Sequence, residues 1–322
     1  MKKFALVFVC PALLLCATEQ SPWKANDQPA LTPGIIGEWD DWAIACPTIL
    51  KRGSKWWMLY EGIIFDTDGV RSAFGTAESD DKMTWRKHSQ NPLFTPALSE
   101  TQSCSSPCAT WWRNGFLVVY IVSEDQIQAA FSGKNPEDAP VAARLARSDD
   151  GLIWNNMPAA QVPIFSKTPH GFQPCLYAEG DRLHLWWIGP DVEDQPALFH
   201  SISSDGLNWS KPNGQPTKEI DAREISCVRV YPSGDFYLLT YVASEADRSP
   251  GKISVVTRIS RDARNWTAQG PPEFPLASLP IDGTPWMIFE SDGARLFWSE
   301  QQPNNAWRLS SAFCEKKNYA SH

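Results

Sequence analysis

A pattern of seven residues, Ser-x-Asp-x-x-x-Trp, recurs along this chain and limits the folds that it can adopt. Glycine follows the aspartate in two of the copies, which is a strong signal for a tight hairpin between strands. An apolar or alternating stretch precedes each copy, as expected of a strand that enters such a hairpin. The four copies begin at Ser79, Ser148, Ser203 and Ser260 and end at Trp85, Trp154, Trp209 and Trp266.

A second repeat runs in phase with the first. Four prolines each stand 13 residues before an aromatic residue, in the pairs Pro47 and Tyr60, Pro107 and Tyr120, Pro174 and Trp187, and Pro285 and Trp298. Ser226 opens a fifth copy that ends at Tyr241. The copies start 52 to 67 residues apart, which suits one four-stranded sheet each, and no long helix-period stretch interrupts them. The predicted fold class is all-β, a five-bladed β-propeller of mostly four-stranded blades.

The C-terminal end of the chain is one strand short of a complete last blade. Only nine residues follow the predicted third strand, which ends at Phe313. Near the N-terminus, the segment Pro29–Pro33 resembles Pro92–Pro96, which ends the first blade. We therefore expect residues 28–36 to supply the outer strand of the last blade. The alternative is a last blade of three strands.

The charge balance excludes two classes of partner. The chain has 29 Lys and Arg against 37 Asp and Glu, a formal net charge of −8, and no basic run. An acidic protein of this kind is not expected to bind nucleic acid or an anionic lipid surface.

The first residues have the pattern of an export signal. Lys2 and Lys3 precede the apolar stretch Phe4–Leu15, which is too short for a good membrane-spanning helix. Two outcomes stay open, cleavage after Ala17 or lipidation of Cys16, and the second is disfavoured because Leu15 occupies a position that normally needs a small residue. We predict a signal at residues 1–17, a linker at 18–27 and one propeller domain at 28–322, in a periplasmic, extracellular or lipid-anchored protein.

The mature chain keeps six cysteines, and their spacing does not indicate a zinc site because no Cys-x-x-Cys pair occurs. An even number in an exported protein permits disulfides, whose connectivity stays open. Cys108, Cys175 and Cys227 each follow the first residue of a repeat, so we expect small apolar fillers around the axis. We predict no metal and no cofactor.

Several segments together resemble one known superfamily. They are Gly37–Asp40, Pro47–Ile49, the aromatic run Trp56–Tyr60 and the Ser-x-Asp-Gly hairpins. The chain resembles the five-bladed propeller superfamily of arabinanases, invertases and levansucrases, glycoside hydrolase families 43, 32 and 68. The resemblance implies an active site in the axial funnel, where one carboxyl group donates a proton and another attacks or activates water.

The positions of the superfamily's acids carry over only in part. Cys46 and Gln173 stand directly before Pro47 and Pro174, where the resemblance implies acidic residues. Glu224 stands two residues before Ser226, as the general acid of the superfamily does, and is the predicted acid. Asp40, in a Trp-Asp-x-Trp-like segment, is the predicted base or nucleophile, and the alternative is a turn aspartate that binds backbone.

Further residues near the starts of the inner strands are predicted to bind substrate. Aromatic rings can stack on sugars, and polar groups can bind hydroxyl or carboxylate groups. His170 is alternatively a loop cap, and Arg223 a solvated loop charge. The hairpin aspartates are repeated and therefore structural. The predicted substrate-binding residues are Trp39, Asp41, Trp42, His170, Gln173, Arg223 and Asp282.

Two hypotheses about function follow. The first is an exported glycosidase or transglycosylase that acts on a carbohydrate substrate and is expected to be a monomer. The second is a non-catalytic propeller that binds a glycan or a protein at the cell envelope, which the missing acids at Cys46 and Gln173 favour.

Overall fold

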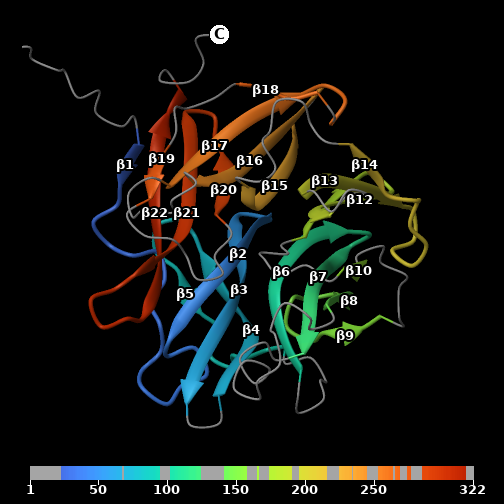
Figure 1. The fold of residues 1–322 in the computed structure, drawn as a ribbon. Coiled ribbons are helices and arrows are strands. Elements are labelled where there is room, and N and C mark those ends of the chain that lie inside the picture. Colours follow the sequence, from blue (N-terminus) through green and yellow to red (C-terminus); the bar gives the residue numbers. More distant parts are fainter. Residues whose placement is uncertain are drawn as a thin grey trace, which may run out of the picture.

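The computed structural model has the all-β architecture of a β-propeller (Figure 1). Every element of the described residues is a β-strand, and neighbouring strands of each sheet are antiparallel apart from one parallel contact. The structure describes residues 23–66, 69–94, 102–124, 141–157, 165–166, 174–190, 196–215, 225–233, 235–244, 253–263, 265–268, 274–276 and 285–316.

The first and last repeats belong to one hydrogen-bonded sheet with the order β20-β21-β22-β2-β3-β4-β5. A single parallel contact between Ala43 and Trp307 joins the two halves. Blade one consists of β2 (Ala43–Arg52), β3 (Lys55–Asp66), β4 (Gly69–Ser79) and β5 (Arg86–Lys87). The last blade consists of β20 (Trp286–Phe289), β21 (Gly293–Gln301), β22 (Trp307–Glu315) and the N-terminal strand β1 (Trp23–Ala25).

The middle repeats form three separate sheets. Blade two contains β6 (Gln102–Trp112), β7 (Gly115–Glu124), β8 (Val141–Ser148), β9 (Asn155–Asn156) and β10 (Phe165–Ser166). Blade three contains β11 (Cys175–Glu179), β12 (Arg182–Pro190), β13 (Pro196–Ser203) and β14 (Asn213–Gln215). Blade four contains β15 (Ile225–Ser233), β16 (Phe236–Ser244), β17 (Ile253–Ser260), β18 (Thr267–Ala268) and β19 (Phe274–Leu276).

The core lies between the blades. The run from Phe116 to Val122 in β7 is buried at every position, because neighbouring blades cover both faces of this strand. Trp57 from blade one packs on Phe116 of blade two with ring centroids 4.2 Å apart. Burial of such large aromatic surfaces is the main stabilising contribution to a propeller.

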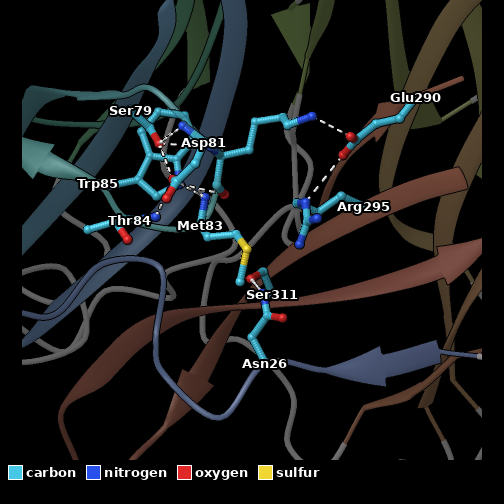
Figure 2. Close-up of polar contacts among 10 residues, drawn as sticks. Asn26, Ser79, Asp81, Met83, Thr84, Trp85, Glu290, Arg295 and Ser311 are labelled. Carbon is cyan, nitrogen blue, oxygen red and sulfur yellow. Dashed lines mark hydrogen bonds and ion pairs between the residues drawn. The ribbon is translucent and has the colours of Figure 1, made fainter. Parts of the chain in front are cut away.

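The repeated hairpins are structural, as predicted. In each copy the serine hydroxyl lies 2.9–3.1 Å from the aspartate, and backbone N–H groups donate to the same carboxylate. Donation from Thr84 and Met83 lowers the pKa of Asp81 to about 2. Figure 2 shows Ser79, Asp81 and Trp85 of the first copy.

Contacts between blades define the two ends of the molecule. Arg52, the last residue of β2, donates to the carbonyl of Asp150 in the hairpin of blade two at 2.9 Å. Arg113, in the turn after β6, donates to the carbonyl of Ser204 in blade three at 2.8 Å. The hairpins therefore lie at the end where the innermost strands turn back, the turn end. The opposite end, where the innermost strands begin, is called the entry end.

The N-terminal segment closes the last blade. Trp23 is the register partner of Cys314 on β22, and Leu31 forms a bridge with Leu309 on the same strand. The prediction that an N-terminal segment pairs with the last blade is thus confirmed. The pairing spans residues 23–31 instead of 28–36, so it begins within the expected linker. Polar contacts add to this closure, including Asn26 with the hydroxyl of Ser311 at 2.7 Å (Figure 2).

An ion-pair cluster joins the last blade to the first at the turn end (Figure 2). The carboxylate of Glu290, in the turn after β20, contacts the ammonium group of Lys82 in the hairpin of blade one. It also contacts the guanidinium of Arg295 at 3.3 Å. This contact repeats the turn-to-hairpin geometry of Arg52 and Arg113, so the closing interface is built like the others.

The innermost strands carry a β-bulge at the entry end in blades one, two and four. Cys46 and Ser106 occupy these bulges with φ values of 47° and 53°. A bulge bends the strand and turns a side chain out of the regular alternation, and bulges recur beside active sites.

The register of blade four differs from the prediction. Thr48, Cys108 and Cys175 each pair with the residue before the aromatic of their repeat. In blade four this partner is Thr240, and it pairs with Arg229. The predicted equivalence of Cys227 with Cys108 and Cys175 is therefore wrong, because two extra residues in the turn of blade four displaced the alignment.

Candidate active site

The innermost strands surround the axis, and one position of each faces it at the same level. The residues at this position are Thr48, Cys108, Cys175, Arg229 and Trp286, as their cross-strand partners show. Their side chains link one innermost strand to the next. The N–H of Ala109 donates to the hydroxyl of Thr48 at 3.3 Å, and that of Leu176 donates to the sulfur of Cys108 at 3.3 Å.

Three small side chains, one cation and one indole ring therefore line this level of the axis. Cys108 and Cys175 are buried fillers, as predicted for these two cysteines. Arg229 is fully buried, donates to the carbonyl of Pro174 at 2.8 Å and lies 5.5 Å from the ring centre of Trp286. The sequence analysis missed this arginine, because counting from Ser226 had placed Cys227 at this position of blade four.

Asp40 lies in the loop before β2 and is only 1% exposed. Its Oδ2 accepts hydrogen bonds from the ammonium group of Lys87 at 2.6 Å and from the hydroxyl of Tyr60 at 3.2 Å. Burial, followed by the charge of Asp40, raises the pKa of Tyr60 well above its usual value. Because Tyr60 belongs to β3 and Lys87 to β5, the carboxylate lies over the face of blade one that these two strands share.

The second oxygen of Asp40, Oδ1, is buried without a hydrogen-bond partner. Gly34 covers it, and a Cβ atom at Gly34 would stand 2.6 Å from this oxygen. The catalytic role of Asp40 stays a prediction, and its contacts by themselves are those of a clamp that holds the loop against the blade.

The three residues beside Asp40 make local contacts. Trp39 lies against Gly62 and Gly75, where any side chain would collide with its ring. Asp41 accepts the N–H of Gly37 at 2.7 Å, which is the contact of a turn aspartate. Trp42 lies 5.8 Å from Phe65, which is 57% exposed at the entry end. Of the predicted stacking residues, Trp42 thus lies nearest to an open apolar surface.

Glu61 is a buried carboxylate that the sequence analysis missed. It is 1% exposed, stands opposite Ala45 next to the bulge of blade one, and its Oε2 accepts the N–H of Ser106 in the bulge of blade two at 2.9 Å. Since β3 neighbours Tyr60 and Glu61 point to opposite faces, Asp40 and Glu61 lie on opposite sides of the blade. Glu61 directly follows Tyr60, the aromatic residue that ends the repeat, and no feature of the sequence marked it as a site residue.

Five predicted site residues lie outside the described residues. They are His170, Gln173, Arg223, Glu224 and Asp282. The register shift of blade four bears on the choice of Glu224. The residue 13 before Tyr241 is Val228, so the position two residues earlier is Ser226 and not Glu224. The role of Glu224 as the general acid remains a prediction that no longer has this positional support.

Within the ranges that the structure describes, no group of three or more His, Cys, Asp or Glu side chains is arranged to hold a metal ion. The same ranges contain no helix with the length and apolar character needed to cross a membrane.

The sequence matches no family model and no curated protein. The fold, by contrast, is shared with solved structures of carbohydrate-active proteins. A structure described as a glycoside hydrolase aligns with a TM-score of 0.64 at 15% identity, over 90% of this chain and 92% of that one. An N-acetylgalactosamine deacetylase from F. plautii, in complex with blood group B trisaccharide, aligns with a TM-score of 0.63 at 15% identity, over 90% and 95% of the two chains.

A third similar structure belongs to one of the families named above. The GH32 β-fructofuranosidase of Bombyx mori aligns with a TM-score of 0.59 at 14% identity, over 88% of this chain and 61% of that longer chain. The chain therefore has the propeller fold of glycoside hydrolases, as predicted. Its likeness to families 43 and 68 stays a prediction.

Proposed function

We propose that this protein is an exported glycoside hydrolase or transglycosylase that acts on a glycan at the entry end of the propeller axis. The observation that carries this proposal is the propeller fold shared with glycoside hydrolases over about nine-tenths of the chain. Two buried carboxylates of blade one, Asp40 and Glu61, add support.

The proposed chemistry needs two carboxyl groups in different protonation states. One donates a proton to the leaving oxygen while the other, ionised, attacks the sugar or activates water. Glu224 is the proposed acid. For the second role Asp40 competes with Glu61, and a role for Asp40 requires the loop at residues 33–38 to move, since Gly34 covers the free oxygen.

A second candidate function rests on a specific observation. Cys46 occupies the bulge of β2 directly before Pro47, where the superfamily resemblance implies an acid. Gln173, the other position where an acid is implied and missing, lies outside the described residues. This favours a non-catalytic propeller that binds a glycan or a protein at the cell envelope, with the same funnel as its binding site.

One set of measurements separates the two functions. The purified protein is incubated with furanosides, fructans and arabinans, and products are measured by mass spectrometry beside binding to a glycan array. The variants are Glu224→Gln, Asp40→Asn and Glu61→Gln, with Asp149→Asn, at a side chain that is 89% exposed, as the control. Loss of product in one of the first three, with product retained in the control, supports catalysis by that residue. Binding without product after long incubation contradicts the enzyme and supports the binding module.

Export is tested separately from catalysis. The mass of the protein recovered from the cell envelope or medium of the producing organism is expected to lack the first 15 to 17 residues, with a lipid on Cys16 only if that residue is modified. A protein with its full N-terminus in the cytoplasm would contradict export and leave the glycan chemistry to be decided by the product assay.

A further inference from the structure

A buried cation at the axis of the propeller has two donor groups that bind nothing in the protein. Arg229 of β15 is 0% exposed, and its Nη1 donates to the carbonyls of Pro174 and Val228 at 2.8 and 3.3 Å. Its Nε and Nη2 are buried and have no hydrogen-bond partner. These two N–H groups form one edge of the planar guanidinium, and such an edge commonly binds an anion through two parallel hydrogen bonds.

A buried hydroxyl group stands opposite this cation on the neighbouring strand. Thr240 of β16 is the cross-strand partner of Arg229 and is 1% exposed. Its Oγ1 is also buried without a hydrogen-bond partner. Cross-strand partners extend from the same face of a sheet, with their Cβ atoms about 5 Å apart. Because buried polar groups are nearly always hydrogen-bonded, two neighbouring exceptions indicate a shared ligand.

The two axial thiols nearest to Arg229 do not supply a counter-charge. Cys108 donates its S–H to the carbonyl of Leu176 at 3.8 Å, and Cys175 donates to the carbonyl of Val230 at 3.5 Å. A sulfur that donates its proton in this way is a neutral thiol. Among the described residues, moreover, no ion pair joins Arg229 to a carboxylate.

The other neighbours of Arg229 are uncharged as well. Burial raises the pKa of Tyr231 well above its usual value, so its phenol is neutral near pH 7. The thiol of Cys46 is buried, which disfavours its ionised form. The ring of Trp286 lies 5.5 Å from the guanidinium and attracts it, but the ring carries no net charge. Because a guanidinium stays charged and is costly to bury alone, the compensating charge is to be sought outside these side chains.

We propose that the axis binds a small inorganic anion through Nε and Nη2 of Arg229, with the hydroxyl of Thr240 beside it. A bound anion gives both N–H groups an acceptor and neutralises the guanidinium, whereas a water molecule would satisfy the donors without adding charge. Arg229 belongs to blade four, binds a carbonyl of blade three and lies against Trp286 of blade five. The anion thus reinforces the axis where three blades meet. This inference goes beyond the proposed function and does not depend on it.

Chloride is the probe for this site. The purified protein is transferred to a chloride-free buffer and unfolded thermally at increasing sodium chloride, with sodium gluconate keeping the ionic strength constant. The Tm should rise with chloride and then saturate, as for a ligand that binds only the folded state. Arg229→Met should abolish this dependence.

Arg113→Met is the matched control variant. Arg113 also donates to a carbonyl of a neighbouring blade, at 2.8 Å, and lies 4.3 Å from the ring centre of Trp112. Its side chain is exposed, however, so it needs no bound anion and the variant should keep the chloride dependence of the wild type.

Bromide locates the anion in the wild-type protein without any variant. Crystals soaked in sodium bromide should show an anomalous difference peak within hydrogen-bonding distance of Nε and Nη2 of Arg229. This readout decides the question if Arg229→Met does not fold. Three results would overturn the proposal: a Tm that chloride changes equally in the wild type and in Arg229→Met, bromide peaks at the surface alone, or a thiolate absorbance at neutral pH that places the counter-charge on a sulfur.

Discussion

The carboxylate of Asp40 and the ammonium group of Lys87 lie 2.6 Å apart and fasten the loop before the first innermost strand to the outermost strand of the same blade. The carboxylate is 1% exposed and the lysine side chain 27% exposed. Tyr60 completes the contact, and Asn91 donates to its hydroxyl at 3.1 Å. A charge pair so placed holds together segments that are 47 residues apart in the sequence.

Lys87→Met should destabilise the fold by about 2–4 kcal/mol, because it leaves the carboxylate of Asp40 buried without a counter-charge. Urea unfolding measures the change. The double variant Asp40→Asn with Lys87→Met should cost less than the sum of the two single variants. Lys55→Met is the control, since its pair with Glu78 is 51% and 44% exposed and should contribute little. Equal effects of Lys87→Met and Lys55→Met would contradict the clamp.

Leu31→Ala should destabilise the protein by about 2–4 kcal/mol, because Leu31 is 5% exposed and packs in the core between the first and last blades. Its backbone also pairs with Leu309, so the variant tests the closure by the N-terminal segment directly. Ile36→Ala is a matched control five residues later, where the side chain is 99% exposed. Similar unfolding free energies for both variants would contradict a closing role of this segment.

The repeats of the sequence predicted the propeller because each blade must bury the same hairpin and the same aromatic position. The pairing of an N-terminal strand with the last blade could be predicted too, because the last repeat lacked a strand. Its position was five residues off at the start because Trp23 pairs with β22 without any proline signal. The sequence repeats therefore predict the fold. The ends of the closing segment depend on individual contacts that do not belong to any repeat.

The site was less predictable for physical reasons. The turn of blade four is longer, so counting from Ser226 placed Cys227 where the structure has Arg229. Glu61 belongs to a second strand and reaches the bulge of another blade, a contact that spans 45 residues. The ion pair of Asp40 with Lys87 is equally distant in sequence. A single sequence carries no local signal for such distant pairings.

Glu290→Gln should destabilise the closing interface by about 1–3 kcal/mol, because it removes the ion pairs of Glu290 with Lys82 and Arg295. The three side chains are 11–21% exposed, which places this cluster between surface and buried pairs. Chemical unfolding at low and high salt is the measurement, and salt should reduce the difference only in part. Asp80→Asn, which removes an ion pair with Arg86 that is about 60% exposed, serves as the control and should change stability by less than about 0.5 kcal/mol.

The protein should lose stability in mild acid because of two stacked imidazoles in blade three. Nδ1 of His184 lies 3.1 Å from Nε2 of His200, and the ring of Trp186 stacks on both. Burial lowers the pKa of His184, whose other nitrogen lies 3.5 Å from Glu179. The unfolded chain therefore takes up the proton at a higher pH than the folded protein does, so the contribution of His184 is complete above about pH 6.5 and is lost as the pH falls below it.

His184→Gln removes this titrating group while keeping a polar side chain. Between pH 7.5 and pH 5, the unfolding free energy of the variant should fall less than that of the wild type, as measured by urea unfolding at each pH. A His184→Gln curve parallel to that of the wild type would mean that His184 binds its proton equally well in both states, against the burial that the structure gives it.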